Sequence, residues 1–388
     1  MTACAFAPLS SQWHASTRDR LRRRAQAAGL DGLLLLRVSN LAYATGLFLS
    51  ANERPMGLWL PVSGDPILFM PELERENAET CGIADMRLYD EFPGVTPPVL
   101  WMLDEIGMQS VAIDALDATL LDGAHARTRR LDLHDHAMAE RWIKTPEEIA
   151  LTREAASFAD AFLHRLHIAG GDIIRQGGTE QDLMADAMAH ARSALFAKHG
   201  KAFAGTPMGI TASVHSGPRA ALPHGAVLTR VPQPGETLIS GIGASLGGYH
   251  AESGATFILG QPSREQARIM TAMTACNDAA VEAARPGTRC DAVDLAARNV
   301  LRDAGLGDAI RHRIGHGMGL EGHEAPWLAP GDATPISAGM VFSNEPGVYR
   351  PGVDGYRTIN TMLVTDTGCE VPSRFQTDCP AEQRVIAL

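Results

Sequence analysis

The sequence predicts an α+β protein of two domains, and three observations support this expectation. The chain has 388 residues, which is more than one hydrophobic core usually organises, because single cores stop growing near ~250–300 residues. Its first third alternates short apolar runs with amphipathic stretches, which indicates a smaller α/β domain. The remainder contains two helix pairs, each followed by glycine-punctuated strands, which suggests a duplicated half.

The first third supplies strand and turn signals at short intervals. The apolar runs Leu58–Pro61 and Pro66–Met70 flank Ser63-Gly64-Asp65, which predicts a hairpin. A basic amphipathic helix is expected over Thr17–Gly29, where Gly29 can end it. Buried strands are expected at Leu33–Leu36 and Val111–Asp114, with a turn and helix start at Ser39–Gly46.

A capping signal marks the domain boundary. Thr145 precedes a proline at the first helical position, and Glu148 stands three residues after the threonine. This is a capping box, and its carboxylates suit the positive end of a helix dipole. The sequence therefore predicts a domain over residues 1–144 and a second over residues 145–388, with the helix running to about Ala169.

Similar signals delimit the other helices of the second domain. Gly178-Thr179 predicts the start of a helix that ends at His199-Gly200, and Ser263 with Gln266 forms another capping box. Pro286-Gly287 ends that helix, and a partner is expected over Thr288–Ala304. The repeated openings Gly-Thr-x-x-Asp at 178 and 287 support a duplication.

Composition narrows the functional classes. Hydrophobic residues make up 45% and charged residues 20%, and 34 Lys and Arg against 45 Asp and Glu give a formal net charge of -11. Such an acidic chain repels phosphate backbones, so no nucleic-acid partner is expected. Apolar stretches such as Gly32–Leu36 are too short to span a bilayer, and no membrane partner is expected.

The termini and cysteines favour a cytoplasmic protein. The N-terminus has no basic residue before its short apolar segment, so a signal peptide is not expected. The six cysteines stand singly with no CxxC pair, which is typical of a reducing compartment and argues against a disulfide framework or a structural zinc site. A soluble cytoplasmic enzyme is the expectation.

Polar residues gather in five stretches after residue 200. These stretches are Ser216–Gly225, Ser240–Gly260, His312–Leu328, Gly339–Tyr349 and Gly355–Thr365. In this order they resemble the family of methionine and Xaa-Pro aminopeptidases, prolidase and creatinase. The junction IKTPEEI and the segment SNLAYATG resemble its prolidase and creatinase branch. The resemblance implies a pita-bread C-terminal domain, with duplicated helix pairs on a curved antiparallel sheet, and a smaller α/β creatinase-like N-terminal domain.

The resemblance also implies a metal site, which the residues only partly match. Peptidases of this family bind two divalent ions through two aspartates, one histidine and two glutamates. The matching positions are Gly241, Glu252, His316, Glu345 and Ile359. Two close dications need bridging carboxylates, so the loss of two ligands excludes a paired site. The expectation is therefore no cofactor; in the alternative, a single Mn or Zn ion is held by Glu252, His316 and Glu345.

Creatinase resembles the peptidases in fold but works without metal, which supplies the leading hypothesis. By motif match, His224 would act as base and then acid, and Glu252 with Glu345 would hold a cationic substrate group. His316 and His323 would support the reacting group as hydrogen-bond donors. The chain differs from creatinase at Ile359, where creatinase has a histidine, so creatine itself is not the expected substrate.

Two arginines are candidate substrate contacts. Arg357 matches the arginine before the missing bridging glutamate and can pair with a carboxylate through two hydrogen bonds. Arg54 matches a creatinase arginine that reaches the neighbouring subunit, and this branch implies a homodimer. His250 and His312 match no functional position.

Three functions remain open on these residues. The first is a creatinase-like, metal-independent hydrolase of a C–N bond in a small cationic or zwitterionic substrate. The second is a prolidase-like Xaa-Pro dipeptidase that uses one metal ion. The third is an inactive pita-bread binding protein.

Overall fold

The computed structural model describes residues 6–388, and the chain divides into two compact units. One unit is Leu9–Arg141, and the other contains Trp142–Leu388 together with residues 6–8. Within residues 6–388, no helix has both the length and the apolar character needed to cross a membrane.

The unit Leu9–Arg141 is built on a six-stranded mixed sheet with the strand order β4-β3-β2-β1-β5-β6. Its strands are β1 (Gly32–Leu35), β2 (Gly57–Pro61), β3 (Ile67–Pro71), β4 (Asp85–Tyr89), β5 (Ser110–Ile113) and β6 (Arg130–Asp132). Its α-helices are α1 (Ser11–Ala27), α2 (Val38–Thr45), α3 (Arg75–Glu79), α4 (Pro98–Ile106), α5 (Leu121–His125) and α6 (His136–Arg141).

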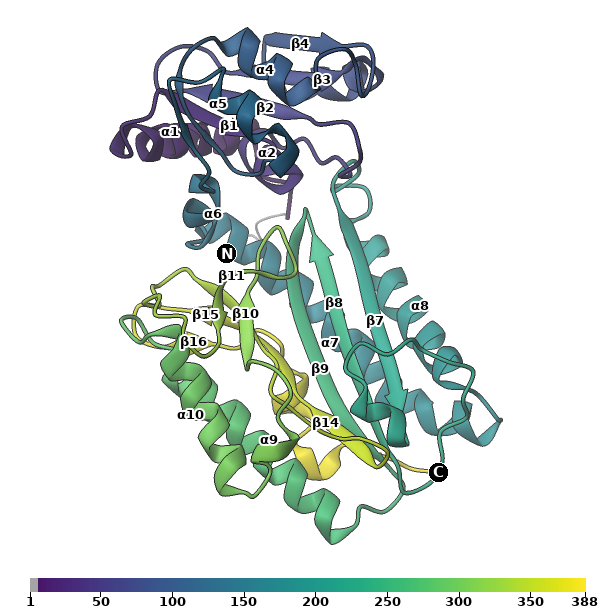
Figure 1. The fold of residues 1–388 in the computed structure, drawn as a ribbon. Coiled ribbons are helices and arrows are strands. Elements are labelled where there is room, and N and C mark those ends of the chain that lie inside the picture. Colours follow the sequence, from purple (N-terminus) through teal and green to yellow (C-terminus); the bar gives the residue numbers. More distant parts are fainter. Residues whose placement is uncertain (1–5) are drawn as a thin grey trace, which may run out of the picture. The chain divides into compact units, whose positions relative to one another are not determined.

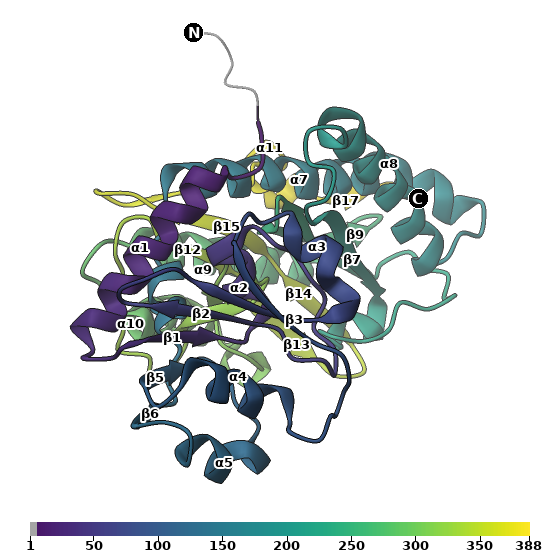
Figure 2. The same cartoon turned by 90° about the horizontal axis from the view of Figure 1, so that it is seen from above.

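The predicted strands of this unit are confirmed with shifts of about one residue, whereas the helix expected from Thr17 already begins at Ser11. Strands β2 and β3 form the expected antiparallel hairpin, with Leu58 opposite Leu68. Helices α4 and α5 lie beside β5 and β6 (Figure 2) and share a core with Leu34, Phe69 and Val111. The apolar side chains of these short strands therefore face helices, and β1 and β5 are buried along their whole length.

The other unit contains a nine-stranded sheet with the main order β11-β10-β12-β15-β9-β8-β7. Strand β16 pairs with β15, β17 pairs with β9, and β13 and β14 form a separate hairpin. The strands are β7 (Met208–Ser216), β8 (Thr237–Leu246), β9 (Tyr249–Leu259), β10 (Gly315–Gly317), β11 (Glu324–Leu328), β12 (Val341–Asn344), β13 (Gly347–Arg350), β14 (Asp354–Arg357), β15 (Ile359–Val364), β16 (Cys369–Glu370) and β17 (Val385–Ile386).

Two pairs of helices cover this sheet (Figure 1). They are α7 (Pro146–Arg175) with α8 (Glu180–His199), and α9 (Arg264–Ala283) with α10 (Cys290–Asp303); a short α11 (Phe375–Asp378) follows. The first pair packs against β7–β9, and the second shares a core with β11, β12 and β15. The expected arrangement of duplicated helix pairs on an antiparallel sheet is confirmed.

The capping signals behave as expected at three helices. Thr145, Thr179 and Ser263 each accept a hydrogen bond at the N-cap, and the third helical residue bonds back. The predicted end of α7 near Ala169 is wrong, because the helix continues to Arg175 through two glycines. A Cβ on Gly171 would lie 2.2 Å from the Ala387 carbonyl oxygen, so this glycine admits the C-terminal segment rather than ending the helix.

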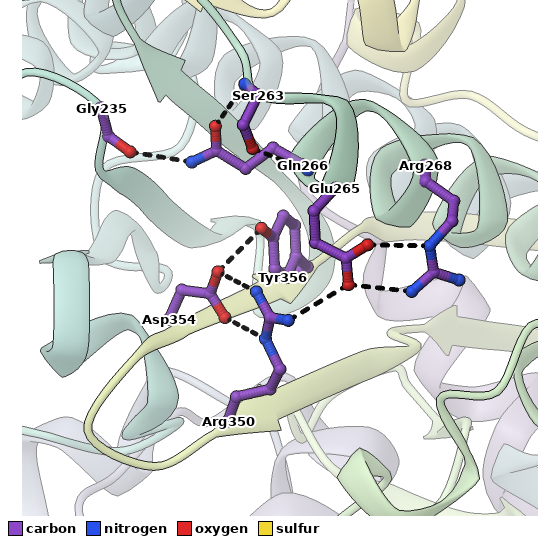
Figure 3. Close-up of polar contacts among 8 residues, drawn as sticks. All are labelled: Gly235, Ser263, Glu265, Gln266, Arg268, Arg350, Asp354 and Tyr356. Atoms are coloured by element: carbon purple, nitrogen blue, oxygen red, sulfur yellow. Dashed lines mark hydrogen bonds and ion pairs between the residues drawn. The ribbon is translucent and has the colours of Figure 1, made fainter.

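The hairpin of β13 and β14 is tied to α9 by a polar network (Figure 3). Arg350 binds Asp354 across the hairpin, with its Nε 2.6 Å from Oδ1, and reaches Glu265 on α9 at 3.3 Å. Tyr356 also donates to Asp354 at 2.9 Å. These contacts hold the hairpin whose last residue, Arg357, belongs to the candidate site.

Candidate active site

A cavity of about 290 Å³ lies over strands β7–β9 and the end of β14. Five of the residues predicted for the site line it: His224, Glu252, His323, Glu345 and Arg357. They come from segments up to 133 positions apart along the chain (224 to 357), so the folded sheet brings together what the sequence separates.

Glu252 lies on β9 and is held by residues of two other strands. The Ser343 hydroxyl donates to its Oε2 at 2.6 Å, and its backbone exchanges two hydrogen bonds of 2.8 Å with the Thr361 hydroxyl. Burial raises the pKa of Glu252 to about 7, and the neighbouring charge of Glu345 adds to this rise. A cation beside Glu252 would favour its ionised form.

His316 is fully buried on β10 and faces both glutamates. Its Nδ1 lies 3.0 Å from the Gly317 carbonyl oxygen, so Nδ1 donates and Nε2 keeps its lone pair. Nε2 is 3.4 Å from Oε1 of Glu345 and 3.7 Å from Oε2 of Glu252. Burial lowers the pKa of His316 to about 3, so the imidazole is neutral.

The strand that carries His316 depends on its flanking glycines. A Cβ on Gly315 would lie 2.0 Å from the Ser343 carbonyl oxygen, and one on Gly317 would lie 2.6 Å from that of Ala325. Only glycine allows β10 to pass this close to both neighbouring strands. The GHG sequence therefore places the imidazole by close backbone packing.

His323 completes the cluster from a loop between β10 and β11. Its ring lies 3.8 Å from that of His316, centroid to centroid, and its Nε2 is 4.0 Å from Oε1 of Glu252. The loop is fixed by His250, whose backbone N–H and ring Nδ1 both lie within 3.0 Å of the Gly319 carbonyl oxygen. His250, which matched no functional position, thus has a structural contact.

The other predicted residues differ in their surroundings. His224 is exposed on the turn before β8 and lines the cavity. His312 is half-buried, and its Nε2 lies 2.9 Å from the Tyr349 hydroxyl. Arg54 lies in the unit Leu9–Arg141, where it is partly exposed and forms an ion pair with Glu53.

One metal ion fits the residues of this site. Nε2 of His316 has no hydrogen-bond partner among residues 6–388, although it is fully buried. Ligand atoms of Glu252, His316 and His323 all lie within 4.8 Å of one another, and Oε1 of Glu345 is close to the same imidazole. A buried lone pair aimed at carboxylates matches the mixed imidazole and carboxylate ligands of divalent transition metals.

A second ion does not fit. Position 241 is a glycine, and a Cβ there would lie 2.6 Å from Nη2 of Arg357 and 3.1 Å from Cδ1 of Ile359. The space beside Gly241 is therefore filled by a cationic and an apolar side chain, and neither can ligate a cation.

Two contributors to the site were missed by the sequence reasoning. Lys144 pairs with Glu324 at 2.8 Å, next to His323, and Ser343 donates to Glu252. Lys144 stands in the IKTPEEI junction, which drew attention to this segment. Its partner Glu324 lies 180 residues away along the chain, so their pairing could not be predicted. Ser343 stands two residues before Glu345, and no feature of the neighbouring sequence indicates its hydrogen bond to Glu252.

Comparison with known proteins identifies the family of the chain. A model of metallopeptidase family M24 matches residues 150–366, which is more than half of the chain. The chain belongs to this family. A model of the creatinase and prolidase N-terminal domain matches residues 18–140, so the expected membership of the prolidase and creatinase branch and the pita-bread fold are confirmed.

Relatives of the family align over nearly the whole chain. A probable dipeptidase PepE of Mycobacterium bovis is 32% identical and covers 93% of each chain. An Xaa-Pro dipeptidase of Lactobacillus delbrueckii is 29% identical over 90% of this chain and 94% of its own. The crystal structure of dipeptidase PepE from Mycobacterium ulcerans superposes with a TM-score of 0.83 at 29% identity, over 98% of this chain and 100% of the other.

These findings correct one expectation and reorder the hypotheses. The expectation of no cofactor is wrong, because the family whose model matches is one of metallopeptidases and the buried His316 lone pair suits a metal. The chain is a hydrolase of the M24 family, acting on peptide C–N bonds. The relatives favour the dipeptidase alternative over the metal-independent, creatinase-like hypothesis.

Proposed function

We propose that the protein is an Xaa-Pro dipeptidase-like peptidase that uses one divalent ion, Mn or Zn. The ion would be held by Glu252, His316 and Glu345, with His323 within reach as a further ligand. The observation that carries the proposal is the unpartnered Nε2 of His316, 3.4 Å and 3.7 Å from the two carboxylates. When bound, such an ion polarises a carbonyl oxygen and lowers the pKa of water.

The remaining residues have separate tasks in this proposal. The exposed imidazole of His224 exchanges a proton at a ring nitrogen with the leaving amine. His323 is half exposed and can donate to the scissile carbonyl. Arg357 lines the cavity and can hold the C-terminal carboxylate of a dipeptide through two hydrogen bonds.

Charge supports a substrate with an anionic end. One dication and the Arg357 guanidinium carry three positive charges, against two negative charges on Glu252 and Glu345. The loaded cavity thus has one surplus positive charge, which favours a carboxylate. The expectation that Glu252 and Glu345 hold a cationic substrate group considered these two charges alone, without the metal ion and Arg357.

The test is a substrate panel with the purified full chain after chelator treatment. Xaa-Pro dipeptides, their C-terminal amides, other dipeptides and creatine would be offered with and without added Mn²⁺ or Zn²⁺. The proposal expects metal-dependent cleavage of Xaa-Pro dipeptides and much slower cleavage of the amides. Turnover of creatine without metal, or no turnover of any dipeptide with metal bound, would refute it.

Two further expectations from the sequence belong to this proposal. The protein would work in the cytoplasm, and it would form a homodimer in which Arg54 reaches the neighbouring subunit's site. The Arg54 side chain is 39% exposed and pairs with the neighbouring Glu53, so it can turn toward another subunit. An Arg54→Ala variant that keeps full activity would argue against this contact.

A further inference from the structure

Gly241 leaves room for the side chains of Arg357 and Ile359, which pack against its backbone. A Cβ added to Gly241 would come within 2.6 Å of Nη2 of Arg357, which is closer than real Cβ contacts allow. A Cβ on Gly254, opposite Gly241 in the sheet, would lie 2.7 Å from the Ile359 side chain. Two glycines therefore open the space that the guanidinium and the isoleucine fill.

The backbone of Arg357 is fixed, whereas its guanidinium is poorly paired. Its N–H donates to the Thr256 hydroxyl at 2.8 Å, and that hydroxyl donates back to its carbonyl oxygen at 3.0 Å. The residue is 6% exposed, its Nη1 lies 3.4 Å from the Pro223 carbonyl oxygen, and the Tyr349 hydroxyl is a further hydrogen-bonding neighbour. Its Nε has no hydrogen-bond partner in the described part of the chain.

A buried guanidinium needs negative charge nearby, because its desolvation costs several kcal/mol. Glu252 and Glu345 line the same cavity and supply that charge. The attraction also acts in the other direction, since Arg357 lowers the pKa of both carboxyls against the rise caused by burial. The charges of the two glutamates and of Arg357 therefore stabilise one another, and the guanidinium lies beside Gly241.

We propose that the Arg357 guanidinium takes the place and supplies the charge of a second metal ion, so that the site binds one divalent cation per chain. This inference rests on the proposed function for the first ion and adds the stoichiometry and its cause. A guanidinium stays charged at all ordinary pH values and has no lone pair to offer a metal. It therefore balances the carboxylates permanently and excludes a second cation by charge and volume.

The experiment counts bound ions on the full chain. Chelator-treated protein would be titrated with Mn²⁺ by calorimetry, and the metal content would be measured after gel filtration. We expect one ion per chain in the wild type. Two ions per chain in the wild type would overturn the inference and leave the proposed peptidase function intact, whereas no bound ion would overturn both.

Variants test whether Arg357 is the cause. Gly241→Asp with Ile359→Glu restores two carboxylates, and with Arg357 retained we expect the count to stay at one. When Arg357→Gln is added to these two substitutions, the number of bound ions should rise to two per chain. A count of two while Arg357 is present, or of one in the folded triple variant, would refute the role of the arginine.

A single substitution keeps the test decisive if the multiple variants do not fold. Arg357→Met removes one positive charge beside the cation and should tighten Mn²⁺ binding roughly tenfold. Arg357→Lys keeps the charge and should bind Mn²⁺ with unchanged affinity. Equal affinities in the Met and Lys variants would overturn the inference, and since neither measurement uses a substrate, failure of peptidase activity would not affect the outcome.

Discussion

The ammonium group of Lys144 lies 2.8 Å from Oε1 of Glu324, and the two side chains are 2% and 0% exposed. Glu324 directly follows His323, so this buried ion pair ties the end of the capped junction segment to the loop that carries a site histidine. Gly319 permits the contact, since a Cβ there would lie 2.6 Å from the Glu324 carboxylate and 2.9 Å from Cε of Lys144.

Removing Lys144 should destabilise the unit that holds the site. Lys144→Met leaves the Glu324 carboxylate buried without its cation, and such broken pairs cost about 3–5 kcal/mol. Urea unfolding of the single variant should show this loss, and the double variant Lys144→Met with Glu324→Gln should recover much of it. A single variant as stable as the wild type would contradict the prediction.

Ser343 should affect the metal through Glu252. Ser343→Ala removes the 2.6 Å hydrogen bond to the carboxylate, and loss of such supporting contacts lowers metal affinity about 10–100-fold. Mn²⁺ titration measures the effect. The matched control is Ser240→Ala, another buried serine, whose hydroxyl donates instead to the Ser213 carbonyl oxygen; an equal loss in the control would argue against the assignment.

His224 should contribute to turnover without contributing to metal binding. Replacing the imidazole by His224→Asn removes the proton carrier, which should lower kcat by about 10²–10⁴-fold. The metal content should remain that of the wild type, because His224 is outside the cluster of ligand atoms. A full rate in this variant would exclude His224 as the acid and base.

Asp114 should make the stability of the N-terminal unit depend on pH. Burial raises its pKa from 3.8 to about 6, although Asn40 and the Leu36 N–H donate to it at 2.8 Å and 2.7 Å. The folded state therefore holds a proton more tightly than the unfolded state, and stability falls as pH rises from about 4 to about 6.

The size of this change in stability follows from the shift in the pKa of Asp114. Each pKa unit corresponds to about 1.4 kcal/mol, so Asp114 can account for roughly 2–3 kcal/mol between those pH values. Asp114→Asn should flatten the dependence of the urea midpoint on pH, whereas Asp122→Asn, at an exposed position on α5, should leave it unchanged. Identical pH profiles for Asp114→Asn and the wild type would contradict the assignment.

Local features explain why much of the fold was predictable. The capping boxes at Thr145, Thr179 and Ser263 involve only neighbouring residues, and each begins a helix as expected. The end of α7 was not predictable, because Gly171 serves a contact with Ala387, more than 200 residues away. The glycines that flank His316 were also interpretable from the sequence, because they have no side chain and let the neighbouring strands approach closely.

The sequence by itself determined the family motifs, the starts of α7, α8 and α9, and five residues that meet in one cavity, because short motifs carry this information locally. Only the tertiary structure decided the charge balance of the site. It places the Arg357 guanidinium against Gly241, directs the lone pair of His316 at two carboxylates, and buries Lys144 beside Glu324. These effects depend on distance and desolvation, which are set by packing between strands that are far apart along the chain.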